Sequence, residues 1–150
     1  MIESDTIKLL RECDAGIKMG VASIEDVQEH VKDGKLRSIL TENKKEHELL
    51  RKDLEAQLNR FQDEGKNPNP IVKGMSWMKT NMKLTVEPED GTIADLMTDG
   101  CNMGVKSLNR YLNQYQAADE TSKSIAKRLI RLEEQLAVDI RGYLYKSSAR

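Results

Sequence analysis

The chain has 150 residues, a length that fits a single domain spanning 1–150 with one sizeable core. Its 24 basic and 25 acidic residues leave a net charge of −1, so neither nucleic acid nor an anionic membrane is expected as a partner. One third of the residues are charged and only 4% are aromatic, which is typical of helices with solvated outer faces.

The N-terminus, MIESDTIKLL, lacks the basic start and apolar run of a signal peptide. No apolar stretch approaches the roughly 20 residues needed to span a bilayer. Cys13 and Cys101 have no metal-ligand spacing, and we interpret them as small buried hydrophobic residues in a reducing compartment. We therefore expect a soluble, cytoplasmic protein.

Two helices are predicted in the first half of the chain, because apolar residues recur there with helical spacing. The first covers about 5–31, with Ser4 or Asp5 as its cap, and the second covers about 35–63. The inward stripe of the first comprises Leu10, Cys13, Ile17, Gly20, Ile24, Val27 and Val31. That of the second comprises Leu36, Leu40, Asn43, His47, Leu50, Leu54, Leu58 and Phe61. The short turn at 32–34 makes these helices antiparallel neighbours.

Two more helices are predicted in the second half, from about 91 to 118 and from about 120 to 145, with Asp119 as the cap of the last. The inward stripe of the third helix comprises Ile93, Met97, Gly100, Gly104, Leu108, Tyr111 and Tyr115. That of the fourth comprises Ile125, Leu129, Leu132, Leu136, Ile140 and Tyr143, with Glu133 beside it. A short turn again makes the pair antiparallel.

The connection between the two pairs, residues 64–90, is too long for a hairpin. It begins with the helix-breaking EGKNPNP, and its apolar residues then predict a short helix near 70–83. A helix of about 28 residues is roughly 40 Å long, a distance that this segment can cross. Two antiparallel pairs joined by a long crossover form an all-α, ferritin-like four-helix bundle in which the second and third helices are parallel.

Three segments resemble a group of small, uncharacterised bacterial ferritin-like bundle proteins. They are LRECDAGIKMGVASIEDV (10–27), IADLMTDGCNMGVKSLNRYLNQY (93–115) and LIRLEEQLAVDIRGYL (129–144). The resemblance covers nearly the whole chain, but it is carried by packing residues. It implies the fold, and it implies no particular reaction.

A complete di-iron site is not expected. Such sites in ferritin-like proteins take Glu-x-x-His motifs from two helices and one glutamate from each of the others. Here Lys44 stands three residues before His47, and Val27 stands three residues before His30. Neither histidine therefore belongs to the required motif.

Three polar residues, Asp14, His47 and Glu133, lie on or beside the inward stripes near the middle of their helices. One interpretation is a hydrogen-bonded polar layer that fixes the register of the helices. Another is a site for a single divalent metal such as iron, manganese or zinc, and a third is that one or more of them face water. No other cofactor is predicted.

Two hypotheses for function follow. The first is a non-catalytic bundle that acts through self-association, as a homodimer, or through an unknown protein partner. Its basis is the apolar residues outside the stripes, namely Met19, Leu49, Ile130 and Val138. The second is a ferritin-like metal protein with redox or storage chemistry. Gly100 and Gly104, inside the third helix, are expected to allow close approach of a neighbouring helix.

Overall fold

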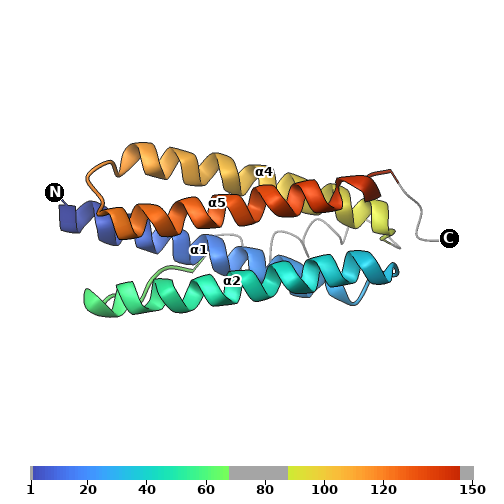
Figure 1. Cartoon of the computed structure of the whole chain (residues 1–150), viewed down its shortest axis with the longest axis horizontal. Coiled ribbons are helices and arrows are strands. Elements are labelled where there is room, and N and C mark those ends of the chain that lie inside the picture. The colour runs from blue at the N-terminus through green and yellow to red at the C-terminus, as the bar shows by residue number, and fades with distance from the viewer. Residues whose placement is uncertain (1, 68–87, 146–150) are drawn as a thin grey trace.

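The computed structural model describes residues 2–67 and 88–145, and it contains four long helices (Figure 1). They are α1 (Ile2–Gln28), α2 (Gly34–Arg60), α4 (Asp90–Gln114) and α5 (Glu120–Ile140), followed by a 3₁₀ turn, η1 (Arg141–Tyr143). The four predicted helices are confirmed, and the described residues form no strand. The short helix predicted near 70–83 lies outside the described residues.

Two of the helix starts have the side-chain caps that stabilise an N-terminus. Asp33 accepts a hydrogen bond from the Leu36 amide at 2.9 Å, and Asp119 accepts one from the Ser122 amide at 2.8 Å. The predicted cap of α1 was wrong, because this helix begins at Ile2 and so contains both proposed cap residues, Ser4 and Asp5.

Side-chain contacts at both ends of the bundle define the direction in which the helices run. At one end, the Asp90 carboxylate at the start of α4 accepts hydrogen bonds from the Lys32 and Asp33 amides at 2.9 and 3.0 Å. At the other, the turn after α4 meets the start of α1, where Thr6 accepts a hydrogen bond from the Asp119 amide. Both α2 and α4 therefore start at the same end and run in the same direction (Figure 1).

The inward stripes form a core that is divided in two along the bundle. One cluster includes Ile17, Leu50, Leu108 and Leu129, and the other includes Ile24, Leu40, Cys101 and Leu136. Between these two sets, each of the four helices places a small or polar residue at the dividing level. Those residues are Gly20 on α1, Asn43 and His47 on α2, Gly104 on α4, and Glu133 on α5.

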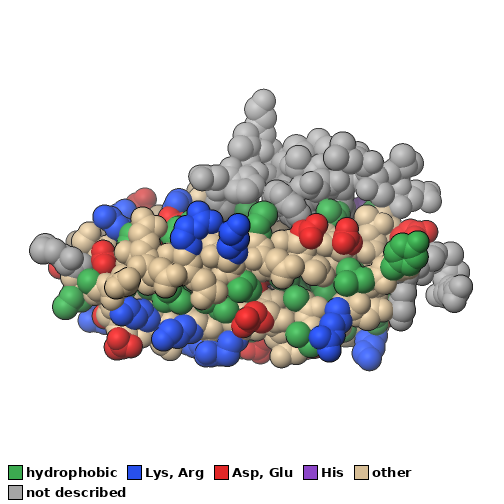
Figure 2. Space-filling model, turned by 90° about the horizontal axis from the view of Figure 1, so that it is seen from above, with side chains coloured by type: hydrophobic (Ala, Val, Ile, Leu, Met, Phe, Trp, Pro, Cys, Tyr) green, Lys and Arg blue, Asp and Glu red, His purple; other side chains and the backbone are tan. Residues whose placement is uncertain are grey.

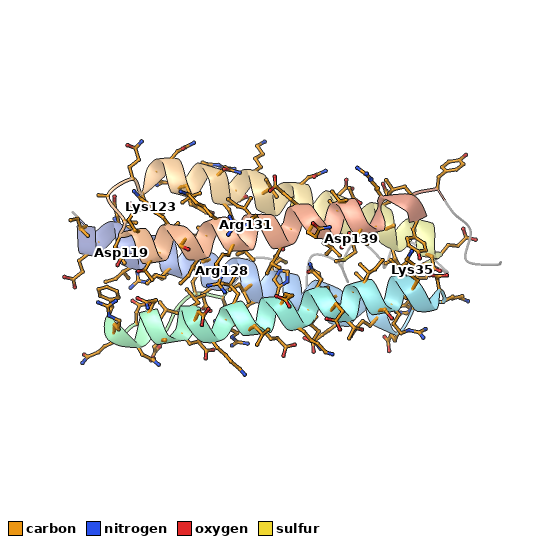
Figure 3. All side chains as sticks on the ribbon, in the orientation of Figure 1. Lys35, Asp119, Lys123, Arg128, Arg131 and Asp139 are labelled. Atoms are coloured by element: carbon orange, nitrogen blue, oxygen red, sulfur yellow. The ribbon has the colours of Figure 1, made fainter. Side chains whose placement is uncertain are left out.

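The outer faces carry charged side chains of both signs. Figure 2 shows acidic, basic and hydrophobic side chains interspersed on one such face. In Figure 3, Arg128 points from α5 towards α2, where its guanidinium lies 3.0 Å from the Asp53 carboxylate. No helix among the described residues is long and apolar enough to cross a membrane.

The apolar residues proposed to lie outside the core divide into two kinds. Leu49 and Val138 are exposed, at 54% and 47% of their surface. Ile130, in contrast, is a buried member of the core, and Met19 is half-buried. The prediction for Ile130 was therefore wrong, because α5 buries a wider face than the single stripe read from the sequence.

Candidate functional site

His47 and Glu133 form a direct pair at the level that divides the core. His47 is fully buried and Glu133 is 9% exposed. The His47 Nε2 atom lies 2.9 Å from Glu133 Oε1, and His47 Nδ1 lies 2.9 Å from the Asn43 carbonyl oxygen one turn earlier on α2. Since a carbonyl can only accept, Nδ1 carries a proton and donates it, which leaves Nε2 to meet the carboxylate.

The surroundings of His47 favour its charged form. Burial by itself lowers the pKa of this imidazole, but the hydrogen bond to Glu133, the negative charge of that carboxylate and the Asn43 carbonyl together outweigh burial. The pKa of His47 is consequently raised above its ordinary value. With both ring nitrogens protonated, the imidazolium donates at each end, and its charge balances that of Glu133.

Asp14 is buried, at 2% exposure, but it interacts with groups other than His47 and Glu133. Its carboxylate forms an ion pair with Lys18 at 2.7 Å and accepts a hydrogen bond from the Lys66 backbone amide at 3.0 Å. Beside it, Gly65 adopts a φ of +83°, and a Cβ there would lie 2.2 Å from the Asp14 carboxylate. Asp14 therefore fastens the chain after α2 to α1, and it does not join His47 and Glu133 in one cluster.

Two glycines frame the pair. A Cβ on Gly20 of α1 would lie 2.6 Å from His47 Nε2, too close for any real contact, so this position requires glycine while the ring stays in place. A Cβ on Gly104 of α4 would lie 3.5 Å from Glu133 Oε2, an ordinary contact distance. The three atoms nearest to that position all belong to the Glu133 side chain of α5, and the expected close approach of a neighbouring helix at Gly104 stays a prediction.

The space beside the glycines is a cavity of about 250 Å³ between α1 and α4. In this bundle α1 packs chiefly on α2, and α4 packs chiefly on α5, so the α1–α4 contact is the looser one. The apolar side chains along the cavity include Met19, Ile24, Met97, Met103, Leu108, Leu129 and Leu136, while Glu12, Lys66, Ser23 and Ser107 contribute polar groups to its lining. His47 and Glu133 also line it, which brings the polar pair within reach of any molecule in the cavity.

The four glycines in the interiors of described helices all line this cavity: Gly16 and Gly20 on α1, and Gly100 and Gly104 on α4. In each pair the glycines are one turn apart. Close packing was predicted only for the second pair, although the matching spacing in both helices indicated a shared surface.

Cys101 is a further member of the site that sequence analysis did not identify. Burial is the first cause that raises the pKa of its thiol, and the charge of Glu133 and a hydrogen bond to that carboxylate add to the effect. The thiol therefore stays protonated at neutral pH. It acts here as a hydrogen-bond donor to Glu133 rather than as a nucleophile, since the thiolate is the reactive form.

Within residues 2–67 and 88–145, no group of three or more His, Cys, Asp or Glu side chains has an arrangement that suits a metal ion. The chemistry that the described residues bring together is a charge-balanced imidazolium–carboxylate pair beside an apolar space. Such an arrangement can accept a hydrogen bond from a bound molecule.

No protein-family model, curated protein or solved structure matches the chain.

Proposed function

We propose that this chain is a non-catalytic four-helix-bundle protein that acts by binding, and that the cavity between α1 and α4 is its binding site. The proposal includes a ferritin-like arrangement with a crossover between α2 and α4. The parallel direction of α2 and α4 and the segments that resemble ferritin-like bundle proteins support that arrangement.

One observation carries the binding proposal: every glycine in the interior of a described helix lines the same cavity. Each interior glycine costs roughly 1 kcal/mol relative to alanine. Close packing of α1 against α4 would offset that cost, but among residues 2–67 and 88–145 the two helices line a partly open space instead. A bound molecule that needs the room explains both the glycines and the space.

The alternative is a single divalent metal held by the polar residues. Its support is the direct contact of His47 with Glu133, two of the three residues that were expected to hold such a metal. Against it, Asp14 is paired with Lys18, and His47 already uses both ring nitrogens. Metal analysis of protein purified without an affinity tag separates the alternatives. A stoichiometric metal that His47→Ala abolishes would replace the binding proposal.

We also propose that the protein forms a homodimer. The exposed Leu49 and Val138 support it, because a partner would remove their side chains from water. Light scattering at micromolar concentration is expected to give about twice the chain mass of 17.1 kDa. A mass equal to one chain across the concentration range would contradict the dimer without affecting the cavity.

Titration with benzene tests the binding site, since a cavity of about 150 Å³ is enough to hold this molecule. In ¹H–¹⁵N spectra, benzene is expected to shift the amide signals of Gly16, Gly20, Gly100 and Gly104. Gly104→Leu, which fills the cavity, should abolish these shifts, whereas Asn102→Leu, which places the same side chain on an exposed position of α4, should preserve them. Absence of shifts in the parent protein would refute the binding site.

A further inference from the structure

We propose that the ligand of the α1–α4 cavity is a small, uncharged, mainly apolar molecule of one or two rings that bears one N–H or O–H donor, which Glu133 accepts. The inference rests on the proposed function and adds to it the chemical class of the ligand. Its basis is the size of the cavity, the chemistry of its walls, the Glu133 carboxylate that lines it, and the charge that His47 places behind that carboxylate. The other carboxylate in the lining, Glu12, is already paired with the Lys66 ammonium at 2.5 Å.

Size limits the ligand to a small ring system. The cavity measures about 250 Å³, larger than the roughly 150 Å³ of an apolar cavity that binds benzene and below the range of about 300–1,000 Å³ that is usual for drug-sized ligands. A molecule somewhat larger than benzene therefore fits, and a nucleotide or a haem does not.

The walls favour an apolar ring. The three methionines, Met19, Met97 and Met103, are adaptable side chains that contact aromatic rings favourably through sulfur. The four glycines of the lining expose backbone without a side chain, so a flat molecule can lie between the two helices. Leu129 and Leu136 of α5 flank Glu133 on the floor and leave its carboxylate as the polar anchor there.

The position of Glu133 supplies that anchor. Its Oε1 atom accepts from His47, and its Oε2 atom lies 3.5 Å from the Cβ position of Gly104, on the side of α4. The carboxylate has about four acceptor positions. Those filled by His47 and by the Cys101 thiol leave capacity for a donor from a ligand.

The charge balance selects an uncharged donor. The His47 ring, whose surroundings favour its charged form, lies 2.9 Å from the carboxylate, and the pair as a whole is neutral when this ring is protonated. A cationic ligand would add an uncompensated charge to an apolar cavity, and the cost of desolvating it would exceed the gain. A neutral N–H or O–H loses little on desolvation and forms a strong hydrogen bond with a carboxylate.

A matched pair of probes tests the donor. Indole and benzothiophene have the same two-ring shape, but only indole has an N–H. Isothermal titration of the folded, full-length chain is expected to show indole binding about tenfold more tightly, equivalent to about 1.4 kcal/mol. The donor rule is wrong if benzothiophene binds as tightly as indole.

Variants of two adjacent glutamates locate the anchor. Glu133→Leu should bring indole to the affinity of benzothiophene, whereas Glu134→Leu, at an exposed position of α5, should preserve the difference. If indole keeps its advantage in a folded Glu133→Leu protein, another group accepts the hydrogen bond from its N–H and the assignment of Glu133 is wrong. Should Glu133→Leu not fold, the two probes on the parent protein still decide the donor rule.

The results distinguish this inference from the proposed function. Shifts with benzene together with equal affinities for indole and benzothiophene would keep the binding site and refute the ligand class. Absence of binding for all three probes would refute both.

Discussion

Gly20→Ala probes the site with one added methyl group. A Cβ at this position would lie 2.6 Å from His47 Nε2, 2.9 Å from His47 Cδ2 and 3.4 Å from Glu133 Oε1. The ring cannot swing aside freely, because it is fully buried and both of its nitrogens are hydrogen-bonded. The added methyl must therefore displace the imidazole from Glu133.

The expected cost follows from three contributions. Overpacking of a well-packed core costs about 1–3 kcal/mol, and loss of a hydrogen bond to a charged group costs about 1.5–3 kcal/mol. Replacing glycine by alanine inside a helix stabilises the folded protein by roughly 1 kcal/mol. The net loss of unfolding free energy for Gly20→Ala is therefore expected to be about 1.5–5 kcal/mol.

Gly104→Ala is the matched control, because its Cβ would make only an ordinary contact at 3.5 Å with Glu133. The helix-propensity term then dominates, and this variant should be more stable than the parent by up to about 1 kcal/mol. Urea unfolding followed by circular dichroism measures both variants under the same conditions.

A double-mutant cycle with His47→Ala identifies the cause. Without the imidazole the added methyl has no ring to displace, so Gly20→Ala should cost little, or even stabilise, in the His47→Ala background. The reasoning is refuted if Gly20→Ala is as stable as the parent, or if its full cost persists after His47 has been removed.

Two further outcomes follow from the buried polar residues. The pKa of His47 is raised in the folded state. Its pairing with Glu133 should therefore contribute fully to the free energy of unfolding below about pH 6.5, and this contribution should be lost as the pH rises through the folded pKa. The unfolding free energy of the parent relative to Glu133→Gln should fall over that interval, and a flat difference would contradict it. Asp14→Ala should cost about 1–3 kcal/mol in urea unfolding by orphaning the Lys66 amide, whereas Asp14→Asn should cost less; equal costs would show that the acceptor does not matter.

Helix periodicity alone identified most of the core. The stripes on α1 and α2 place Ile17, Ile24, Leu40 and Leu50 inward, and all four are buried. The same periodicity placed His47 on an inward face, and this histidine is buried as well. A repeat near 3.6 residues determines which face of a helix is apolar, and burial of that face follows because no other face can form a core.

The partners of the buried polar residues did not follow from periodicity. Asp14 occupies the same kind of position as His47, yet it pairs with Lys18 and with the amide of Lys66, which lies 52 residues away. That contact depends on the path of the chain after α2, where Gly65 turns with a positive φ. A stripe gives the direction of a side chain, but it does not give the loop that passes over it.

The cavity also escaped sequence analysis, and the reason is physical. Small residues on an inward face are compatible with two outcomes: helices in close contact, or helices that leave a space between them. Gly100 and Gly104 were interpreted as the first, but Gly104 faces Glu133 across an ordinary contact distance. The separation of two helices depends on side chains throughout the bundle, so it cannot be predicted from the apolar stripe of one helix.

The His47–Glu133 pair lines the cavity, which indicates that this level of the bundle serves binding rather than stability. A buried ion pair is weak evidence of stabilisation, because well-packed hydrophobic residues of similar volume often serve as well or better. Interior glycines, and space that the described side chains leave unfilled, each lower stability further. All three features meet at Gly20, His47, Gly104 and Glu133, while apolar side chains dominate the core on either side. Since departures from good local packing concentrate at functional sites, a ligand seated against Glu133 accounts for all three together.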